Sequence, residues 1–192
     1  EQGRAKHIIS QPCAAVTNYI LKYRHDLLPS LSPVHSPMLC TAVYAKKYLG
    51  ETGKLAALSP CIAKKDEFEQ TGGLVQYNVT FKMLKKYIES NRLSLPASLS
   101  SDNVFDGGEG ITGAIYPKPG GLKKNIQLYN PHIRVINSEG VNKVYGELDA
   151  YSKESINNLP VVFDVLNCEF GCNSGPGVGG SNSLFQMDEV MH

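Results

Sequence analysis

The sequence NCEFGCNSGPGVGG, at residues 167–180, decides how the rest of the chain is interpreted. Cys168 and Cys172 place two thiols within one short stretch, and residues 174–180 are mostly Gly and Pro. The apolar segment at residues 161–166 leads directly into this stretch and is typical of a buried strand. Glycine costs backbone entropy and is commonly placed where another group comes close to the main chain. We therefore expect a bulky, thiolate-bound group at the end of this strand.

Length and composition narrow the class of protein. The chain has 192 residues, 42% of them hydrophobic, which is enough for one sizeable core or two small lobes. The net charge of +1 gives no basic field, so nucleic acid is not expected as a partner. No apolar run reaches membrane-spanning length and no signal peptide opens the chain, so we expect a cytoplasmic protein without a membrane span. In that compartment, five cysteines favour free thiols or cofactor ligands over disulfides.

Short apolar segments alternate with helical patterns along the chain. Strands are expected at residues 6–9, 54–58, 133–136 and 161–166. Helices are expected at residues 12–26, 38–49, 62–69 and 81–88, near residue 122, and at residues 141–148. Residues 27–37 and 91–110 are expected to form loops. The alternation favours an α/β fold, with parallel or mixed sheets flanked by helices in two small lobes.

Three cysteines follow expected strands by a few residues: Cys13, Cys61 and Cys168. In open α/β sheets, ligands bind outside the carboxyl ends of the strands. Three distant segments should therefore deliver thiols to one site between the two lobes. We expect residues 1–180 to form this cofactor-binding domain, as a piece of a longer chain, and residues 181–192 to form a tail.

Four thiolates from separate strand ends could bind zinc, an iron–sulfur cluster or nothing. Structural zinc sites usually show paired thiols in two knuckles, whereas only Cys168 and Cys172 are close in this sequence. Dispersed ligands fit a bulky cubane better than a compact ion. Packing as a small buried hydrophobic residue is the alternative for each cysteine. It is the favoured interpretation for Cys40, which lies within an expected helix with no glycine beside it.

Three segments resemble the signatures of the [FeFe]-hydrogenases, the iron-only hydrogenase family. Residues 59–67, SPCIAKKDE, resemble the second signature, M-P-C-x-x-K-x-x-E, and residues 168–180 resemble the third, C-x-x-x-C followed by glycines. Residues 10–13, SQPC, are similar to a divergent form of the first, T-S-C-C-P. The likeness covers about residues 6–180. The second and third signatures together are specific, whereas the first alone would be weak.

The resemblance implies an H-cluster, which consists of a [4Fe–4S] cluster and a diiron subsite carrying CO, cyanide and a dithiolate amine. The implied ligands of the [4Fe–4S] cluster are Cys13, Cys61, Cys168 and Cys172. Cys172 is also implied to bridge to the diiron subsite. The further residues implied to contact the cofactor are Lys64, Ser59, Pro60 and Gly175.

The resemblance gives Lys64 a specific task, the donation of its ammonium group to a cyanide ligand. Cys172 and Lys64 are thus the candidate catalytic residues. A buried anionic cofactor needs hydrogen-bond donors and a counter-charge, so this task makes physical sense. Helix starts after Pro12 and Pro60 would add amide dipoles of the right sign. Without the flanking signature, Lys64 would be interpreted as a solvated lysine, and Glu67 could equally be a surface carboxylate.

The chain also departs from the family pattern. Family enzymes carry a second cysteine just before the first ligand, and it relays protons to the amine. Pro12 occupies that place, with Gln11 before it, and neither is a useful acid or base. Ser59 replaces the methionine of the second signature, and the aromatic residue after the first signature is absent, with Val16 nearby. No C-x-x-C-x-x-C ferredoxin motif is present, so we expect electrons from a ferredoxin-type donor or a fused iron–sulfur domain.

These observations favour one function over two alternatives. The favoured one is the H-cluster domain of a divergent, sensory [FeFe]-hydrogenase-like oxidoreductase of anaerobic metabolism. It would interconvert H₂ with protons and electrons, slowly or as an H₂ sensor, and could pass its signal to a downstream sensory domain. The first alternative is a non-catalytic hydrogenase-like iron–sulfur scaffold or assembly protein without the diiron subsite. A zinc-stapled α/β domain is a weaker alternative. Lys64 favours the enzyme, because a cubane alone does not need it, whereas the missing relay cysteine favours the scaffold or slow turnover.

Overall fold

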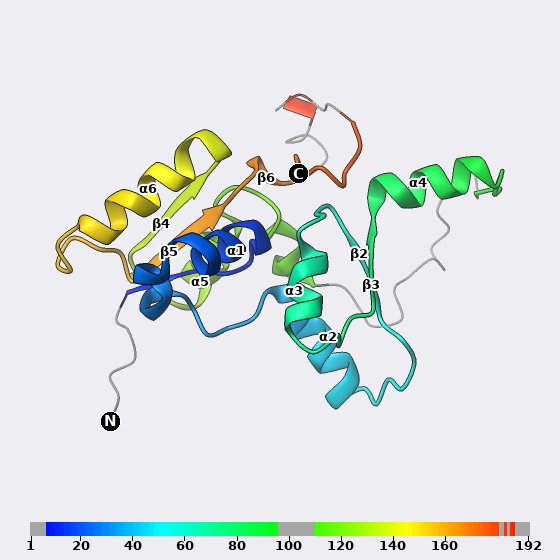
Figure 1. The fold of residues 1–192 in the computed structure, drawn as a ribbon, viewed down its shortest axis with the longest axis horizontal. Helices are drawn as coiled ribbons and strands as arrows, with labels where there is room; N and C mark the ends of the chain where they lie inside the picture. The colour runs from blue at the N-terminus through cyan, green and yellow to red at the C-terminus, as the bar shows by residue number, and fades with distance from the viewer. Residues whose placement is uncertain (1–6, 96–109, 181–182, 184, 187–192) are drawn as a thin grey trace.

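Two small parallel sheets organise the chain in the computed structural model, which describes residues 7–95, 110–180, 183 and 185–186. The first sheet has the strand order β1-β5-β4 and the second pairs β2 with β3. The strands are β1 (Ile8–Ile9), β2 (Ala56–Ser59), β3 (Tyr77–Thr80), β4 (Val135–Glu139) and β5 (Val162–Leu166). Figure 1 shows each sheet in its own half of the molecule with helices around it. The predicted fold, an α/β arrangement of helix-flanked parallel sheets in two lobes, is confirmed.

The first lobe is built around β5, whose five residues are all buried. A strand that is covered on both faces is a near-continuous apolar run, which is why the sequence signal at residues 161–166 was strong. Helices α1 (Ala14–Tyr23) and α6 (Val141–Lys153) bury apolar side chains against this strand. The shared core includes Ile9, Val16, Ile20, Val144, Leu148, Phe163 and Val165. Helix α5 (Gly121–Tyr129) contacts β4.

The second lobe has a smaller core. Helices α2 (Pro37–Lys47), α3 (Lys64–Gln70) and α4 (Phe81–Ser90) accompany β2 and β3. The buried cluster consists of Leu39, Ala42, Phe68 and Val75. Two of its helices begin after a capping residue, because the Ser36 and Thr80 hydroxyls accept hydrogen bonds from backbone amides of the first turn, each at 3.3 Å. Pro37 occupies the first turn of α2, where it is tolerated.

The structure also contains elements that the sequence did not predict. Strand β3 has mixed polarity and is only partly buried, so its sequence lacks a strong strand signal. Strand β6 (Glu169–Cys172) lies inside the glycine-rich stretch. The short 3-10 helices η1 (His25–Ser30) and η2 (Ile111–Ile115) are further additions. Most of the loop expected at residues 91–110 and of the tail expected at residues 181–192 lies outside the described residues.

No helix in the described part of the chain is both long enough and apolar enough to cross a membrane.

Candidate metal centre

The four predicted cysteine ligands line one cavity of about 230 Å³, called here the thiol cavity. Cys61 follows the end of β2 and Cys168 follows the end of β5, so each lobe delivers a thiol from the carboxyl end of a parallel strand. Cys13 lies immediately before α1, and Cys172 ends β6. The predicted convergence of these four side chains is confirmed.

The backbone around Cys61 is held by two polar side chains. The Ser59 hydroxyl lies 3.0 Å from the Cys61 carbonyl oxygen and accepts from the Cys61 amide at 3.3 Å. The Asn78 side-chain amide donates to the same carbonyl at 2.8 Å. Ser59 is fully buried and lines neither the thiol cavity nor the larger cavity beside it. Ser59 therefore holds the backbone of Cys61, whereas the sequence predicted that it contacts the cofactor directly. Asn78 was missed because it is distant in sequence.

The glycines of residues 174–180 make room for protein backbone. A Cβ atom at Gly175 would lie far inside van der Waals distance of the Pro60 carbonyl oxygen, and one at Gly177 would lie 2.8 Å from the same group. The Gly177 amide donates to that carbonyl at 2.9 Å. Gly175 also lines the thiol cavity. The close approach expected from the glycines is thus made by the segment that carries Cys61.

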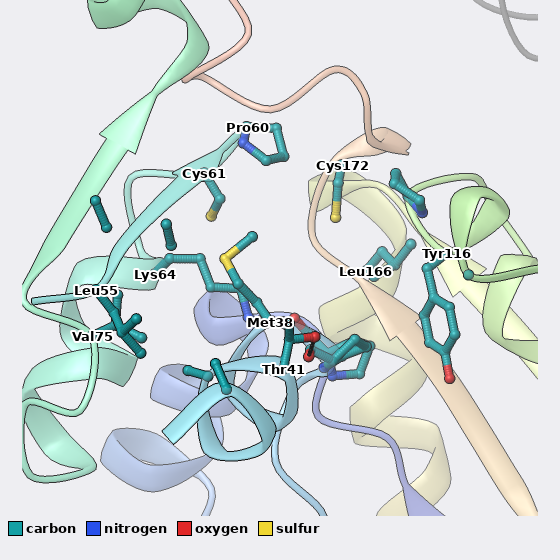
Figure 2. A pocket seen from close by; sticks show the side chains of 18 residues that line it. Met38, Thr41, Leu55, Pro60, Cys61, Lys64, Val75, Tyr116, Leu166 and Cys172 are labelled. Carbon is teal, nitrogen blue, oxygen red and sulfur yellow. Dashed lines mark hydrogen bonds between the residues drawn. The ribbon is translucent and has the colours of Figure 1, made fainter. Parts of the chain in front are cut away.

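A second cavity of about 470 Å³, called here the apolar cavity, lies beside the thiol cavity. Its walls include Met38 and Ala42 of α2, Ala57 of β2, and Pro60. Figure 2 shows the Cys61 and Cys172 side chains entering it from opposite sides, with Met38 between them. The two cavities share part of their lining: Pro12, Cys61, Lys64, Leu166 and Cys172.

Lys64 is buried at the junction of the two cavities, with 7% of its surface exposed. Its Nζ donates to Glu67 Oε2 at 2.6 Å and to the Pro12 carbonyl oxygen at 3.0 Å. The Glu67 side chain is 13% exposed, so it is a partly buried ion-pair partner and not a surface carboxylate. A buried ammonium needs such partners, because an uncompensated charge in the interior is costly. The ammonium therefore lies at the cavities with acceptors from two different segments.

Burial disfavours ionisation of three thiols: Cys61, Cys168 and Cys172. It raises the pKa of Cys172 to about 12, with a further contribution from the other three thiols, while Lys64 opposes the rise. Burial likewise raises the pKa of Cys61 and of Cys168. A metal-bound thiol is deprotonated outright, so loading this cavity with metal would release protons. Among the described residues, no three His, Cys, Asp or Glu side chains are arranged to hold one metal ion.

Cys40 stands apart from the other four cysteines. It lies on α2, is exposed, and contacts the His35 carbonyl oxygen at 3.5 Å. The predicted core packing of Cys40 is wrong. Leu39 and Ala42 define the buried face of α2, and Cys40 projects from the other side of that helix.

Comparison with known proteins identifies the family of this chain. Residues 1–158 match the family model described as the iron only hydrogenase large subunit, C-terminal domain. No curated protein matches the chain significantly.

Solved structures with the same fold are [FeFe]-hydrogenases. One, from a study of oxygen inactivation through modification of the H cluster 2Fe subcluster, has a TM-score of 0.68 at 14% identity, with 98% of this chain and 67% of that chain covered. A second structure, HydA(deltaEFG), comes from a study of stepwise H-cluster assembly. It has a TM-score of 0.68 at 14% identity, with 96% of this chain and 65% of that chain covered. A third is an apo [FeFe]-hydrogenase from Chlamydomonas reinhardtii in which one cysteine is replaced by histidine. It has a TM-score of 0.68 at 15% identity, with 96% of this chain and 65% of that chain covered.

At these identities the solved structures establish a shared fold, and this chain spans about two thirds of their length. The family model matches most of the chain. The chain belongs to the family formed by the C-terminal domains of iron-only hydrogenase large subunits.

Proposed function

We propose that this chain is the H-cluster-binding domain of a hydrogenase-type oxidoreductase. The thiol cavity would take the [4Fe–4S] cluster on Cys13, Cys61, Cys168 and Cys172, and the apolar cavity would take the diiron subsite. The observation that carries this proposal is that the two cavities meet at Cys172 and Lys64. Cys172 would be the bridging ligand and Lys64 the cationic donor, and both line the boundary between the two cavities.

The residues of the chain would bind, orient and shield the cofactor. When bound, the H-cluster supplies the redox chemistry that interconverts H₂ with protons and electrons. The apolar walls of the larger cavity would shield a bound cofactor from part of the solvent, which strengthens charge interactions there. Lys64 supplies a positive charge and N–H donors toward an anionic group, after exchanging its contact with the Pro12 carbonyl or sharing it. Glu67 holds the lysine at the junction from the side of α3.

The site lacks an acid–base residue at the position from which family enzymes relay protons to the cofactor. Pro12 lines both cavities at the place where the family has its relay cysteine. Proline has no side-chain proton and no amide hydrogen, so it cannot pass a proton to the cofactor. A positioned acid–base group is commonly worth about 10²–10⁴-fold in rate. We therefore propose slow turnover, which suits a sensor that registers H₂ without consuming it, with a ferredoxin-type protein or fused iron–sulfur domain as the electron partner.

Stepwise loading of the full-length protein tests this function. Anaerobic reconstitution with iron and sulfide should give the broad visible absorption and the iron content of one [4Fe–4S] cluster. Subsequent maturation with the diiron subsite should then give slow but measurable H₂ evolution from a reduced dye. A cubane that accepts no diiron subsite would replace the proposed function by an iron–sulfur scaffold. A protein that binds zinc but no cubane would overturn both.

A further inference from the structure

Asn167 contacts two of the four thiols of the thiol cavity. It lies between the end of β5 and Cys168. Its backbone amide donates to Cys13 Sγ at 3.4 Å. Its side chain lines the thiol cavity beside Cys168 and lowers the pKa of the Cys168 thiol, which burial raises. A single residue therefore offers N–H groups to sulfur atoms that come from two distant segments.

Tyr145 of α6 fixes the orientation of the Asn167 side chain. The Tyr145 hydroxyl donates to Asn167 Oδ1 at 2.5 Å. An asparagine amide has one oxygen acceptor and one NH₂ donor group, so the donor end of Asn167 is left for the Cys168 sulfur. The Tyr145 ring packs edge-on against Tyr19 of α1, with 4.5 Å between ring centroids, which holds the tyrosine in place. Burial raises the pKa of Tyr145, so its hydroxyl remains a donor at neutral pH.

Hydrogen bonds to cluster sulfur atoms act on the reduction potential. Adding an electron to a cubane increases the negative charge on its sulfur ligands, and an N–H donor stabilises the more negative state. Partners behind the ligands orient them and tune the metal in the same way. We propose that Asn167 and Tyr145 are positioning residues that raise the reduction potential of the [4Fe–4S] cluster, with Asn167 donating to its ligands and Tyr145 aiming the Asn167 amide. This inference rests on the proposed function, since it requires a cubane on these cysteines.

The test is a redox titration of the full-length protein reconstituted with the cubane alone, so that no hydrogenase activity enters the measurement. Asn167→Ala removes the side-chain donor and should lower the equilibrium constant for reduction of the cubane about tenfold. For a one-electron couple this lowers the midpoint potential by about 59 mV. Tyr145→Phe keeps the ring and should shift the potential in the same direction by a smaller factor, about threefold, since only the aim of the amide is lost.

Tyr19→Phe is the matched control, because it belongs to the same pair of rings but has no contact with Asn167 among the hydrogen bonds of the described residues. Its potential should equal that of the wild type. Equal iron content and circular dichroism across the series would show that folding and cluster uptake are unchanged. If the wild type takes up the cubane and the Asn167→Ala and Tyr145→Phe variants have the same midpoint potential as the wild type, this inference alone is overturned. A wild-type chain that takes up no cubane would overturn the proposed function, and this inference with it.

Discussion

The thiol cavity and the apolar cavity share a wall but differ in what their residues offer a cofactor. The thiol cavity brings four thiols together, and the backbone amide of Asn167 donates to one of them. The apolar cavity offers few donors, since Pro12 has none and the Thr41 hydroxyl is used within α2, where it donates to the Pro37 carbonyl. In Figure 2 the Tyr116 hydroxyl points away from Cys61 and Cys172. A cubane needs only converging thiolates, whereas a diiron group with anionic ligands needs donors, so the two halves of the site should respond separately to mutation.

The largest effect is expected from Cys172→Ala, because Cys172 belongs to both cavities. The variant should lose the diiron subsite completely and most of the cubane, as measured by iron content and visible absorption after reconstitution. Cys40→Ala is the control, since Cys40 is exposed on α2, and it should load like the wild type. Full cubane content and full diiron uptake in Cys172→Ala would show that this sulfur does not join the two halves of the cofactor.

Lys64→Ala should affect binding of the two halves of the cofactor differently. We expect the cubane to remain and diiron uptake to fall at least about tenfold, because the only ammonium at the junction of the two cavities, among the described residues, is removed. The variant also leaves Glu67 buried without its partner, which commonly costs about 3–5 kcal/mol of stability.

The double variant Lys64→Ala/Glu67→Gln removes the unpaired charge and distinguishes instability from loss of the cofactor contact. Lys65→Ala is the matched control, since the Lys65 side chain is 70% exposed and pairs with Glu69 on the surface. Undiminished diiron uptake in the double variant would rule out the task proposed for Lys64.

Pro12→Cys should restore a proton donor at the shared wall. If the missing relay limits turnover, H₂ evolution by the matured protein should rise by about 10²–10⁴-fold at unchanged cofactor content. Pro12→Ala removes the proline ring without supplying an acid and should give no such gain. Equal rates for wild type and Pro12→Cys would indicate that protons reach the apolar cavity by another path.

The smallest effect concerns the strand that leads to Cys168, outside both cavities. Burial raises the pKa of Asp164 in β5 from its ordinary 3.8 to about 6, partly opposed by a hydrogen bond from Ser10 at 3.2 Å. Because the folded-state pKa is the higher one, the folded protein binds the proton more tightly than the unfolded chain. The Asp164 contribution to the free energy of unfolding should therefore fall as pH rises from about 4 to about 6 and then level off.

Asp164→Asn should abolish this fall. Above pH 6 it should be more stable than the wild type by on the order of 2–3 kcal/mol, because one pKa unit corresponds to about 1.4 kcal/mol. Urea denaturation of both proteins at pH 4 and pH 7 measures the difference. Asp149→Asn, at a half-exposed carboxylate paired with Arg24, should show a much smaller change. A wild type and an Asp164→Asn variant that keep the same stability difference at both pH values would contradict the assignment.

The sequence alone predicted the features that depend on local pattern. The apolar run of β5 and the cysteines after strand ends were sufficient to place Cys61 and Cys168 at one site, because carboxyl ends of parallel strands face the same way in each sheet. The helices expected at residues 38–49 and 81–88 also depend on local pattern, since each begins after a hydroxyl that caps its own first turn.

Features that depend on distant partners could not be predicted. Asn78 supports Cys61 from a strand of weak sequence signal, and Tyr145 reaches Asn167 from a different element, so neither spacing nor composition marks them. Ser59 stands where the second signature has methionine and was expected to contact the cofactor, yet its buried hydroxyl contacts the backbone of Cys61. Cys40 was misjudged because a helical pattern of modest amphipathicity does not show which face is buried.

Infrared spectroscopy of the full-length protein after maturation tests most directly the claim that the two cavities hold the two halves of one cofactor. CO and cyanide bound to iron absorb in a window free of protein bands, and matured Cys172→Ala supplies the blank. The account predicts bands of iron-bound CO and cyanide in the wild type, alongside the visible absorption of the cubane, and none in the variant. A wild-type protein with a full cubane and no such bands would contradict it, and would leave the apolar cavity without the diiron subsite.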